Sequence, residues 1–521
     1  MSALAPLRGP AFRMLWLSWF AANLTVSMGD VASAWLMTSL SNNAMMVALV
    51  QSAATLPVFI LGLPSGALAD ISDRRRFMAA TLAWGAAVAT ALYVLVASGA
   101  LTASLLLGFT FASGIGVAMR WPVFIAIIPE IVSNAELPSA IGLNAIAVHM
   151  SRLLGPVLAG VFLASMGSQY VFLANALLSI IALLLVMQCR PNSKDSTLPG
   201  ERFVGAMRVG LKHVMESPRM RVVLARTYLF FFQVTALTAL LPLVARNYHG
   251  AGIGSFTVML AAMGGGAIAG ILVLPYLRRV LGQDRLIYCG TGIYGIASVI
   301  VVVAPTLWLA LLPMVVVGMA WIGVANSLTI AAQMTLPKWV RARGMSFVQI
   351  AMMGGIASGA ALWGYVANLA TVSISVFAAA IIGPFLFYVL HRLGGSGLAD
   401  EDLTPVKLGS NLVPPVVDLQ SDEGPVIITI EYMVDPTRAD EFRSVMKETR
   451  RARLRQGAVS WKLYFDISEP GRYIEQIVNE SWVDHHRLLE RFTAADASLR
   501  ERRLAFHTLS APPRIQRYLE C

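Results

Sequence analysis

The chain has 521 residues, of which 57% are hydrophobic and only 13% are charged, and its formal net charge at pH 7 is +11. Soluble proteins carry about 25% charged residues, so this composition excludes an ordinary soluble enzyme. An excess of Lys and Arg on one side of a membrane accounts for the positive charge, and we therefore expect no nucleic-acid partner. The 3 cysteines have neither CxxC nor zinc-ligand spacing, so no metal and no cofactor is expected.

Residues 1–393 are predicted to form a helical membrane body. A helix needs about 20 mainly apolar residues to cross a bilayer, and twelve runs of this length are separated by charges, prolines or glycine clusters. The predicted fold class is an all-α membrane protein of twelve transmembrane helices in two six-helix halves, followed by a small α+β ferredoxin-like domain. The spans are expected at 12–40, 43–69, 76–98, 101–128, 137–166, 169–189, 220–248, 253–279, 285–304, 306–334, 342–370 and 372–392.

Basic residues mark one side of this body. Most Lys and Arg residues of the body lie in alternate connections or at the N-terminus, as in the run from Arg74 to Arg76. By the positive-inside rule this side is cytoplasmic. We therefore expect an integral protein of the bacterial inner membrane with both termini in the cytoplasm.

A long basic connection divides the body into halves, 1–189 and 219–393. Four of its apolar residues share one helical face: Phe203, Met207, Leu211 and Val214. Because Arg208 and Lys212 lie elsewhere on that helix, an amphipathic helix lying in the membrane surface is expected here. Two six-helix halves with a site between them are typical of secondary transporters.

The connection between the second and third predicted spans carries a motif. It is G-A-L-A-D-I-S-D-R-R-R, and it resembles the signature G-x-L-A-D-x-x-x-R-R/K of the major facilitator superfamily. The matching residues are Gly66, Leu68, Ala69, Asp70, Arg74 and Arg75. A gate role is expected, since glycine permits close helix contact, Asp70 can cap a helix N-terminus and the arginines can pair with acids or lipid phosphates. The alternative is a basic, solvated turn.

The fifth predicted span contains S-R-L-L-G-P-V-L-A-G. Gly155, Pro156 and Gly160 resemble the motif associated with exporters of this superfamily, G-x-x-x-G-P-x-x-G-G, although Ser151 and Ala159 replace two of its glycines. Small residues at this spacing let helices approach closely, and an internal proline bends the span. The motif favours export, and a kinked packing helix is the alternative.

Further residues narrow the resemblance to one branch of the superfamily, which includes enterobactin-exporter-like proteins and transmembrane secretion effectors. These residues include Asp30, Trp35, Pro122, Glu130, Asn144 and Arg152. The resemblance implies export of a small organic molecule, siderophore-, drug- or metabolite-like, by proton antiport, with membrane lipids as surroundings. An importer or a lipid-type flippase would have the same fold.

Three charged residues lie deep within predicted spans: Asp30, Arg120 and Arg152. A charge at the centre of a bilayer costs about 2.5 to 3.5 kcal/mol on insertion scales, so each is a candidate for proton coupling or the substrate cavity. We expect Asp30 to carry the proton. His149 precedes Arg152 by three residues and shares its helical face. For each residue the alternative is a structural contact, including snorkelling of Arg120 to lipid phosphate.

The end of the chain is predicted to be a separate domain. A linker at 394–425 rich in Gly, Pro and acids leads to a domain at 426–521. The expected order is β-α-β-β-α-β, a ferredoxin-like layer. Its segments are a strand at 426–434, a helix at 438–456, strands at 459–467 and 473–478 around Pro470 and Gly471, helices within 483–503, and a closing strand at 506–509.

This tail resembles the dimeric α+β barrels of small antibiotic-biosynthesis monooxygenases. The resemblance implies that the tail could pair two copies of the chain. Trp461, Trp482, His485 and His486 could line a pocket, but no nucleophile, metal cluster or phosphate loop is evident. We therefore expect no enzymatic activity, and a membrane-tethered monooxygenase-like protein is the alternative.

Overall fold

The structure is a computed structural model that describes residues 4–71, 73–133, 136–188, 203–248, 252–337, 339–394, 404, 406 and 423–520. The chain forms two compact units. The first comprises Met1–Gly200, Leu224–Ala331 and Ser346–Leu393, and the second comprises Glu201–Val223, Ala332–Met345 and Gly394–Cys521. The predicted linker falls almost entirely outside the described residues, and the predicted domain boundaries stay a prediction.

Long helices occur at the positions of the predicted spans. They are α1 (Pro10–Leu40), α2 (Ala44–Ile71), α3 (Arg74–Ala97), α4 (Ala103–Ile131), α5 (Leu137–Ser165), α6 (Ser168–Gln188), α8 (Pro218–Arg246), α9 (Ile253–Leu281), α10 (Gln283–Val303), α11 (Leu307–Thr335), α12 (Arg341–Leu369) and α13 (Val372–Gly394). A short 3₁₀ helix, Ala5–Arg8, precedes them. The amphipathic helix predicted between the halves is α7 (Phe203–Glu216).

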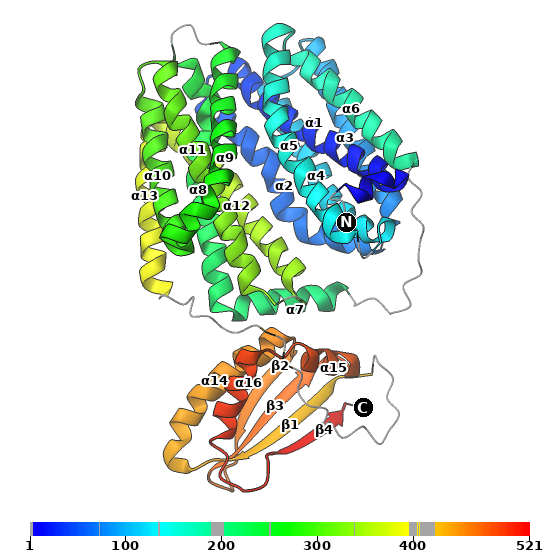
Figure 1. Cartoon of the computed structure of the whole chain (residues 1–521), viewed down its shortest axis with the longest axis vertical. Coiled ribbons are helices and arrows are strands. Elements are labelled where there is room, and N and C mark those ends of the chain that lie inside the picture. The colour runs from blue at the N-terminus through cyan, green and yellow to red at the C-terminus, as the bar shows by residue number, and fades with distance from the viewer. Residues whose placement is uncertain are drawn as a thin grey trace. The chain divides into compact units, whose positions relative to one another are not determined.

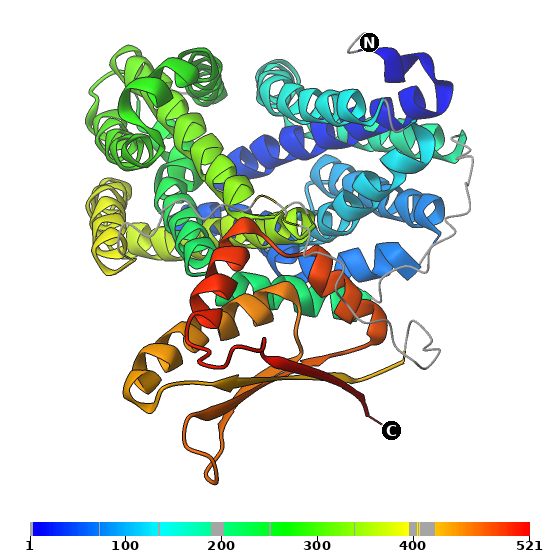
Figure 2. The same ribbon diagram turned by 60° about the horizontal axis from the view of Figure 1, so that its bottom comes forward.

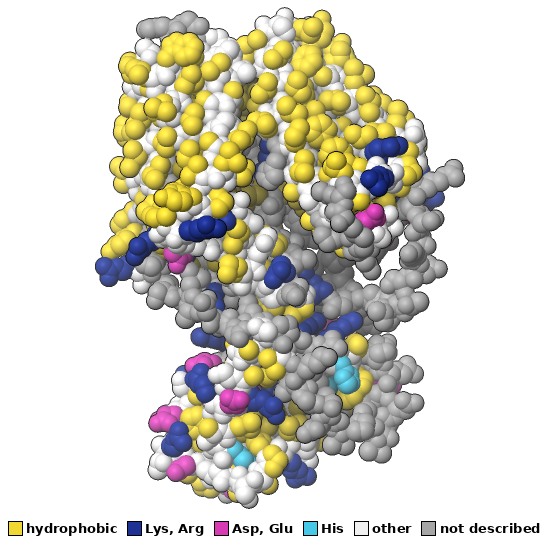
Figure 3. Space-filling model, viewed as in Figure 1, with side chains coloured by type: hydrophobic (Ala, Val, Ile, Leu, Met, Phe, Trp, Pro, Cys, Tyr) yellow, Lys and Arg dark blue, Asp and Glu magenta, His cyan; other side chains and the backbone are white. Residues whose placement is uncertain are grey.

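Eleven helices in the described part of the chain are long and apolar enough to cross a membrane. The helix outside this set is α1, whose polar residues, Asn23 and Asp30 among them, lower its mean hydropathy. The helical membrane fold is therefore confirmed, whereas the count of twelve spans stays a prediction. Hydrophobic side chains cover the visible surface of the bundle, and basic side chains gather near one end of it (Figure 3).

Helices α1–α6 and α8–α13 form two bundles that lie side by side (Figure 1). In the first bundle α2 packs against α4, α3 packs against α6, and α1 packs against both α5 and α6. Two apolar clusters hold its side chains: one around Met28 and Phe172, which continues into the second bundle, and one around Trp19 and Phe124. Helix α1 contributes to both clusters, so its side chains are held along most of its length.

The tail is an antiparallel sheet with helices on one face, as Figure 2 shows. Its elements are β1 (Val426–Met433), α14 (Ala439–Gln456), β2 (Ser460–Phe465), β3 (Arg472–Asn479), α15 (Trp482–Glu490), α16 (Ala494–Leu504) and β4 (Arg514–Leu519). The strand order is β2-β3-β1-β4, with Ile430 of β1 opposite Glu475 of β3 and Ile515 of β4. The ferredoxin-like β-α-β-β-α-β order is confirmed.

The fourth strand is not where we predicted it. Residues 506–509 contribute only an isolated bridge between Val434 and His507, and β4 begins at Arg514. Phe506 instead turns toward Phe442, with 5.8 Å between the ring centres. Phe506 packs against the core of the tail. The chain then passes through Pro512 and Pro513 before β4 pairs with β1.

The turn between β2 and β3 matches the prediction. Gly471 has φ of +94°, in the left-handed region that favours glycine. A Cβ at this position would lie 2.5 Å from the carbonyl oxygen of Val434. Any larger residue would therefore push β1 away from the hairpin.

A fully buried carboxylate ties the tail together. Glu475 of β3 accepts hydrogen bonds from the Trp461 Nε1 and the Tyr432 hydroxyl, both at 2.9 Å. The guanidinium groups of Arg453 and Arg503 lie 3.4 and 3.5 Å from its two oxygens. Burial acts to raise the pKa of Glu475, but the charges of Arg503 and Arg453 and the two hydrogen bonds outweigh it and hold the pKa below its ordinary value.

The variant Glu475→Gln should destabilise the tail by about 3 kcal/mol, because it leaves two arginines without their buried counter-charge. Hydrogen exchange of the β1 and β3 amides in the full chain measures this loss. The control is Glu441→Gln, which removes an exposed ion pair with Arg438.

The stability that Glu475 contributes also depends on pH. Because the pKa of Glu475 is lower in the folded state, this stability is present above the unfolded pKa of about 4.3 and is lost as the pH falls through the folded pKa. Unchanged exchange in Glu475→Gln would contradict this account.

Candidate functional site

Two of the charged residues singled out in the membrane body lie close together. Asp30 is on α1 and Arg152 is on α5, and these helices pack against each other. Each side chain is close enough for its charge to act on the other, yet no direct ion pair joins them among the described residues. Both side chains are exposed within the bundle. Figure 3 shows a recess between the two halves with a basic side chain inside it.

Arg120 does not belong to this pair. Its side chain is only 6% exposed, and its Nη2 donates to the carbonyl oxygen of Ala22 at 3.3 Å. Its guanidinium lies 5.8 Å from the ring centre of Trp19. Asp30 is eight residues beyond Ala22 on α1, about 12 Å along the helix axis. Arg120 therefore holds α4 to α1.

His149 lies on α5, one turn before Arg152. Its backbone is helical, but its side chain lies outside what the structure describes. Its part in the cavity stays a prediction.

The gate motif forms contacts at the start of α3. Arg74 Nη1 lies 2.5 Å from Glu130 Oε1 on α4, and Arg75 Nη2 donates to the carbonyl oxygen of Met187 in the last turn of α6. A cation at this end of a helix is favourable because the helix dipole is negative there. The motif therefore joins α3 to both α4 and α6.

Asp73 caps α3, and the helix cap expected of Asp70 stays a prediction. The Asp73 side chain accepts hydrogen bonds from the backbone nitrogens of Arg75 and Arg76 and so caps α3. Gly66 and Asp70 lie in the last turns of α2, and their side chains are outside the described residues. The sequence contains a signal for the Asp73 cap, because Asp73 directly precedes the first residue of α3.

The export motif sets how closely α5 approaches its neighbours. A Cβ on Gly155 would lie 2.4 Å from the Ser27 Oγ of α1, and a Cβ on Gly160 would lie 2.2 Å from the Thr257 Cγ2 of α9. Pro156 lies inside α5 between these contacts. The absence of a side chain at Gly155 lets α5 contact α1 one turn from Arg152. The absence of a side chain at Gly160 lets α5 contact α9 of the other half.

Other contacts join the two halves near the same end of the bundle, the end predicted to be extracytoplasmic. Trp35 of α1 stacks on Phe256 of α9 with 5.7 Å between ring centres. Ser52 of α2 donates to the carbonyl oxygen of Ala357 of α12 at 2.7 Å. Arg246 of α8 donates to a backbone carbonyl at the end of α1. The contact between α2 and α12 continues towards the middle of the bundle, where a Cβ on Gly354 would lie 2.9 Å from the Phe59 ring.

The second half contains a charged cluster that sequence reasoning did not find. Arg226 of α8 is 4% exposed. Its Nη1 lies 3.0 Å from Asp284 Oδ1, and its Nη2 donates to the Tyr288 hydroxyl at 2.7 Å. Both partners are on α10, 58 and 62 residues further along the chain. Only the tertiary fold reveals this pairing, which ties α8 to α10 within one half.

Comparison with known proteins matches the whole chain to one family. The family model described as transmembrane secretion effector matches residues 1–521. The staphyloferrin A transporter of Staphylococcus aureus is 25% identical over 273 residues, covering 52% of this chain and 68% of the relative. The enterobactin exporter EntS of Citrobacter koseri is 24% identical over 408 residues, covering 74% and 92%. Macrolide efflux protein A of Streptococcus pyogenes is 21% identical over 276 residues, covering 52% and 68%.

Solved transporter structures share the fold. A mutant form of the nucleoside transporter NupG has a TM-score of 0.61 at 13% identity and covers 73% of this chain and 100% of its own. The POT family transporter PepTSo has a TM-score of 0.61 at 13% identity, covering 75% and 99%. A bacterial homologue of the human lysosomal transporter Spinster, inward-facing and occupied, has a TM-score of 0.60 at 14% identity, covering 74% and 97%.

The variant Gly160→Ala should weaken closure of the outer end, because the new methyl group collides with Thr257 on the other half. Reaction of an introduced cysteine at the outer mouth with a membrane-impermeant thiol reagent should rise severalfold. Gly142→Ala on the same helix is the control, since a Cβ there has no neighbour within 4 Å. Combining Gly160→Ala with Thr257→Gly should restore the original reactivity. Equal reactivity of the Gly160→Ala and Gly142→Ala variants would argue against this contact.

Proposed function

We propose that this chain, which belongs to the transmembrane secretion effector family, exports a small organic molecule by secondary active transport. The bundle has the fold of major facilitator superfamily transporters. The observation that carries the proposal is the pair of exposed charges, Asp30 and Arg152, between α1 and α5 in a bundle joined at its outer ends. The protein lies in the bacterial inner membrane with both termini in the cytoplasm.

In this proposal the two halves alternate between two arrangements. The contacts at Gly160, Trp35 and Ser52 hold the outer end closed and leave the cavity open to the cytoplasm, where a substrate enters. Export then requires these contacts to open and the inner ends to meet, which is alternating access of two repeats around a fixed site. Small residues let these helices approach closely, and the stacked rings of Trp35 and Phe256 separate when the outer end opens.

Proton coupling rests on Asp30 and its neighbour. A carboxylate that alternates between water-filled and closed surroundings changes its proton affinity. A positive charge near a carboxylate favours its ionised form, and Arg152 lies on the helix that packs against the helix of Asp30. A donor group of the substrate can bind Asp30 only while Asp30 is ionised, and a proton bound to Asp30 displaces that group. Substrate and proton then exclude each other at the site, as antiport requires.

The substrate class is siderophore-, drug- or metabolite-like. The names of the relatives specify staphyloferrin A, enterobactin and macrolides, which are small organic molecules. A basic side chain in the recess is suited to a substrate that carries acidic groups. An importer or lipid-type flippase with the same fold is the second candidate, since the same inner opening would also release a substrate into the cytoplasm.

The tail is proposed not to be an enzyme. His485 is buried beside Asn479 and Trp482. Burial, together with the charges of Arg517, His486 and Arg453, lowers its pKa to about 4. His485 is therefore neutral at physiological pH, and Glu475 stays ionised between two arginines. Neither group has the pKa near neutrality that suits general acid or base catalysis.

Replacing Asp30 with Asn should abolish proton-driven export while leaving the protein folded and inserted, because the amide cannot exchange a proton. The substrate is first identified by comparing the small molecules retained by cells with and without the gene. Its export from vesicles driven by a pH gradient should then fall to the level of protein-free vesicles. Asp30→Glu is the matched variant and should keep much of the rate. Transport by Asp30→Asn at the normal rate would make Asp30 a structural residue.

The tail is proposed to pair two copies of the chain. Helices α14 and α16 cover one face of the sheet, and the other face carries the exposed side chains of Tyr464 and Tyr518. The fold that the tail resembles buries its open sheet face against a second copy. A domain of about 96 residues gains from such burial because its own core is small.

A chain truncated after Gly394 should therefore be a monomer in mild detergent and should still transport. Mass measurement of the detergent complex gives the oligomeric state, and the vesicle assay gives the rate. Two results count against this proposal: a truncated chain that stays dimeric, and one that folds but exports nothing.

A further inference from the structure

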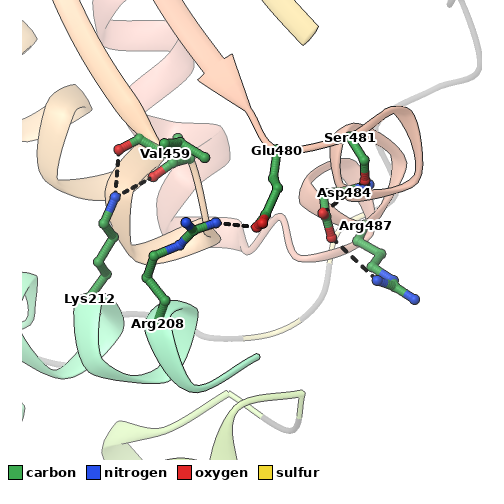
Figure 4. A network of polar contacts seen from close by, with 8 residues as sticks. Arg208, Lys212, Val459, Glu480, Ser481, Asp484 and Arg487 are labelled. Atoms are coloured by element: carbon green, nitrogen blue, oxygen red, sulfur yellow. Dashed lines mark hydrogen bonds and ion pairs between the residues drawn. The ribbon is translucent and has the colours of Figure 1, made fainter. Parts of the chain in front are cut away.

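The polar face of α7 contacts the tail. Arg208 forms an ion pair with Glu480, which follows β3. Lys212 Nζ donates to the carbonyl oxygens of Val459 at 2.5 Å and Ala458 at 3.2 Å. Figure 4 shows both side chains reaching from α7 to the loops at the ends of α14 and β3. The two positive charges on the polar face of α7 therefore bind partners in the tail.

The turn between α11 and α12 takes part in the same contact. Trp339 lies in this turn, and the Arg491 guanidinium of the tail is 4.4 Å from its ring centre. The His213 ring of α7 meets Trp339 edge to face, with 5.5 Å between centres. A desolvated guanidinium over an indole face is a favourable cation–π contact. One aromatic ring thus links α7, the turn and the tail.

On the tail side, the surface is the C-terminal end of α14. Arg491 Nη1 donates to the carbonyl oxygen of Gln456 at 2.9 Å, and His213 Nδ1 lies 3.2 Å from that of Arg455. Lys212 binds the carbonyls that follow. The last carbonyls of a helix lack partners within the helix and carry its negative dipole end, so they suit cationic groups.

A glycine fits this surface against α7. Gly457 ends α14 with φ of +120°. A Cβ there would lie 3.4 Å from Val209 of α7 and 2.7 Å from Arg491 Nη1. The end of α14 therefore packs against Val209 of α7, and the contact combines close packing, opposite charges and an aromatic ring.

We infer that residues 426–521 are a regulatory domain that docks reversibly on α7 and the turn at 336–340 and, when docked, favours the inward-open arrangement. Only Ser217 separates α7 from α8, and the turn joins α11 to α12. The compact unit that holds the tail also holds α7 and the ends of α8, α11 and α12 that are predicted to be cytoplasmic. A docked tail therefore holds together the segments that must move when the inner side closes.

The contact is suited to release. The side chains of Arg208 and Glu480 are 39% and 43% exposed, and ion pairs with such exposure are weak and sensitive to salt. Gln456 Oε1 and Trp339 Nε1 are buried in the contact without a hydrogen-bond partner among the described residues, which weakens it further. The tether that joins the tail to α13 keeps the two surfaces at a high effective concentration, so docking persists without a strong interface.

The test uses charge reversal in the full chain in lipid vesicles. Arg208→Glu and Glu480→Arg each place like charges in contact, and the double variant restores an ion pair. One pair of spin labels, at Met215 of α7 and Asp440 of the tail, reports docking. A second pair, at Ser133 before α5 and Met334 of α11, reports the opening of the inner mouth.

Each single reversal should lengthen and broaden the docking distance and lower the ratio of inward-open to closed molecules about threefold to fivefold. The double variant should restore both readings. Glu441→Arg is the control, since its ion pair with Arg438 lies within the tail, and it should change neither reading.

Two results would overturn the inference: a docking distance that neither reversal alters, and an undocked tail with an unchanged inner mouth. Both readings are distances in a protein that need not transport, so they are independent of whether the proposed export holds.

Discussion

The architecture depends on how closely α5 approaches its neighbours. Gly155 lets α5 touch α1 and Gly160 lets it touch α9, so one helix is in contact with its own half and with the other half. The hydrophobic effect does not drive helices together in lipid. Van der Waals contact between closely packed backbones at small residues stabilises their association instead. The same approach brings Arg152 near Asp30. The two glycines of α5 therefore set how closely the helices pack, and this packing also sets the position of Arg152 relative to Asp30.

Charged residues in the bundle divide into two groups by their surroundings. Arg120 and Arg226 are buried and make their hydrogen bonds to a backbone carbonyl, an aspartate and a tyrosine, which ties helices within one half. Asp30 and Arg152 are exposed and near each other without a direct bond among the described residues. We propose that Asp30 and Arg152 exchange partners with a substrate or a proton. A charge within a span thus indicates function only when its partners are known.

The sequence predicted most of the long helices, α7 and the strands before β4. These elements depend on apolar periodicity, charge and the positions of Gly and Pro, all of which can be seen within a few neighbouring residues. The errors came from tertiary contacts. Phe506 was assigned to a strand because nothing local shows that it packs on Phe442. No partner was predicted for Arg208 and Lys212, because their partners, Glu480 and Val459, are 272 and 247 residues away in sequence. The pairing of Arg226 with Asp284 was missed for the same reason.

The most direct test of this account is the distance between the outer ends of the two halves. Spin labels at Met166 after α5 and Thr371 before α13 would report it in vesicles with and without a pH gradient. The account predicts a dominant short distance at equal pH and a second, longer distance that grows when the gradient is imposed. The longer population should be absent from Asp30→Asn under the same gradient. A single distance that no gradient changes would contradict alternating access coupled to protons.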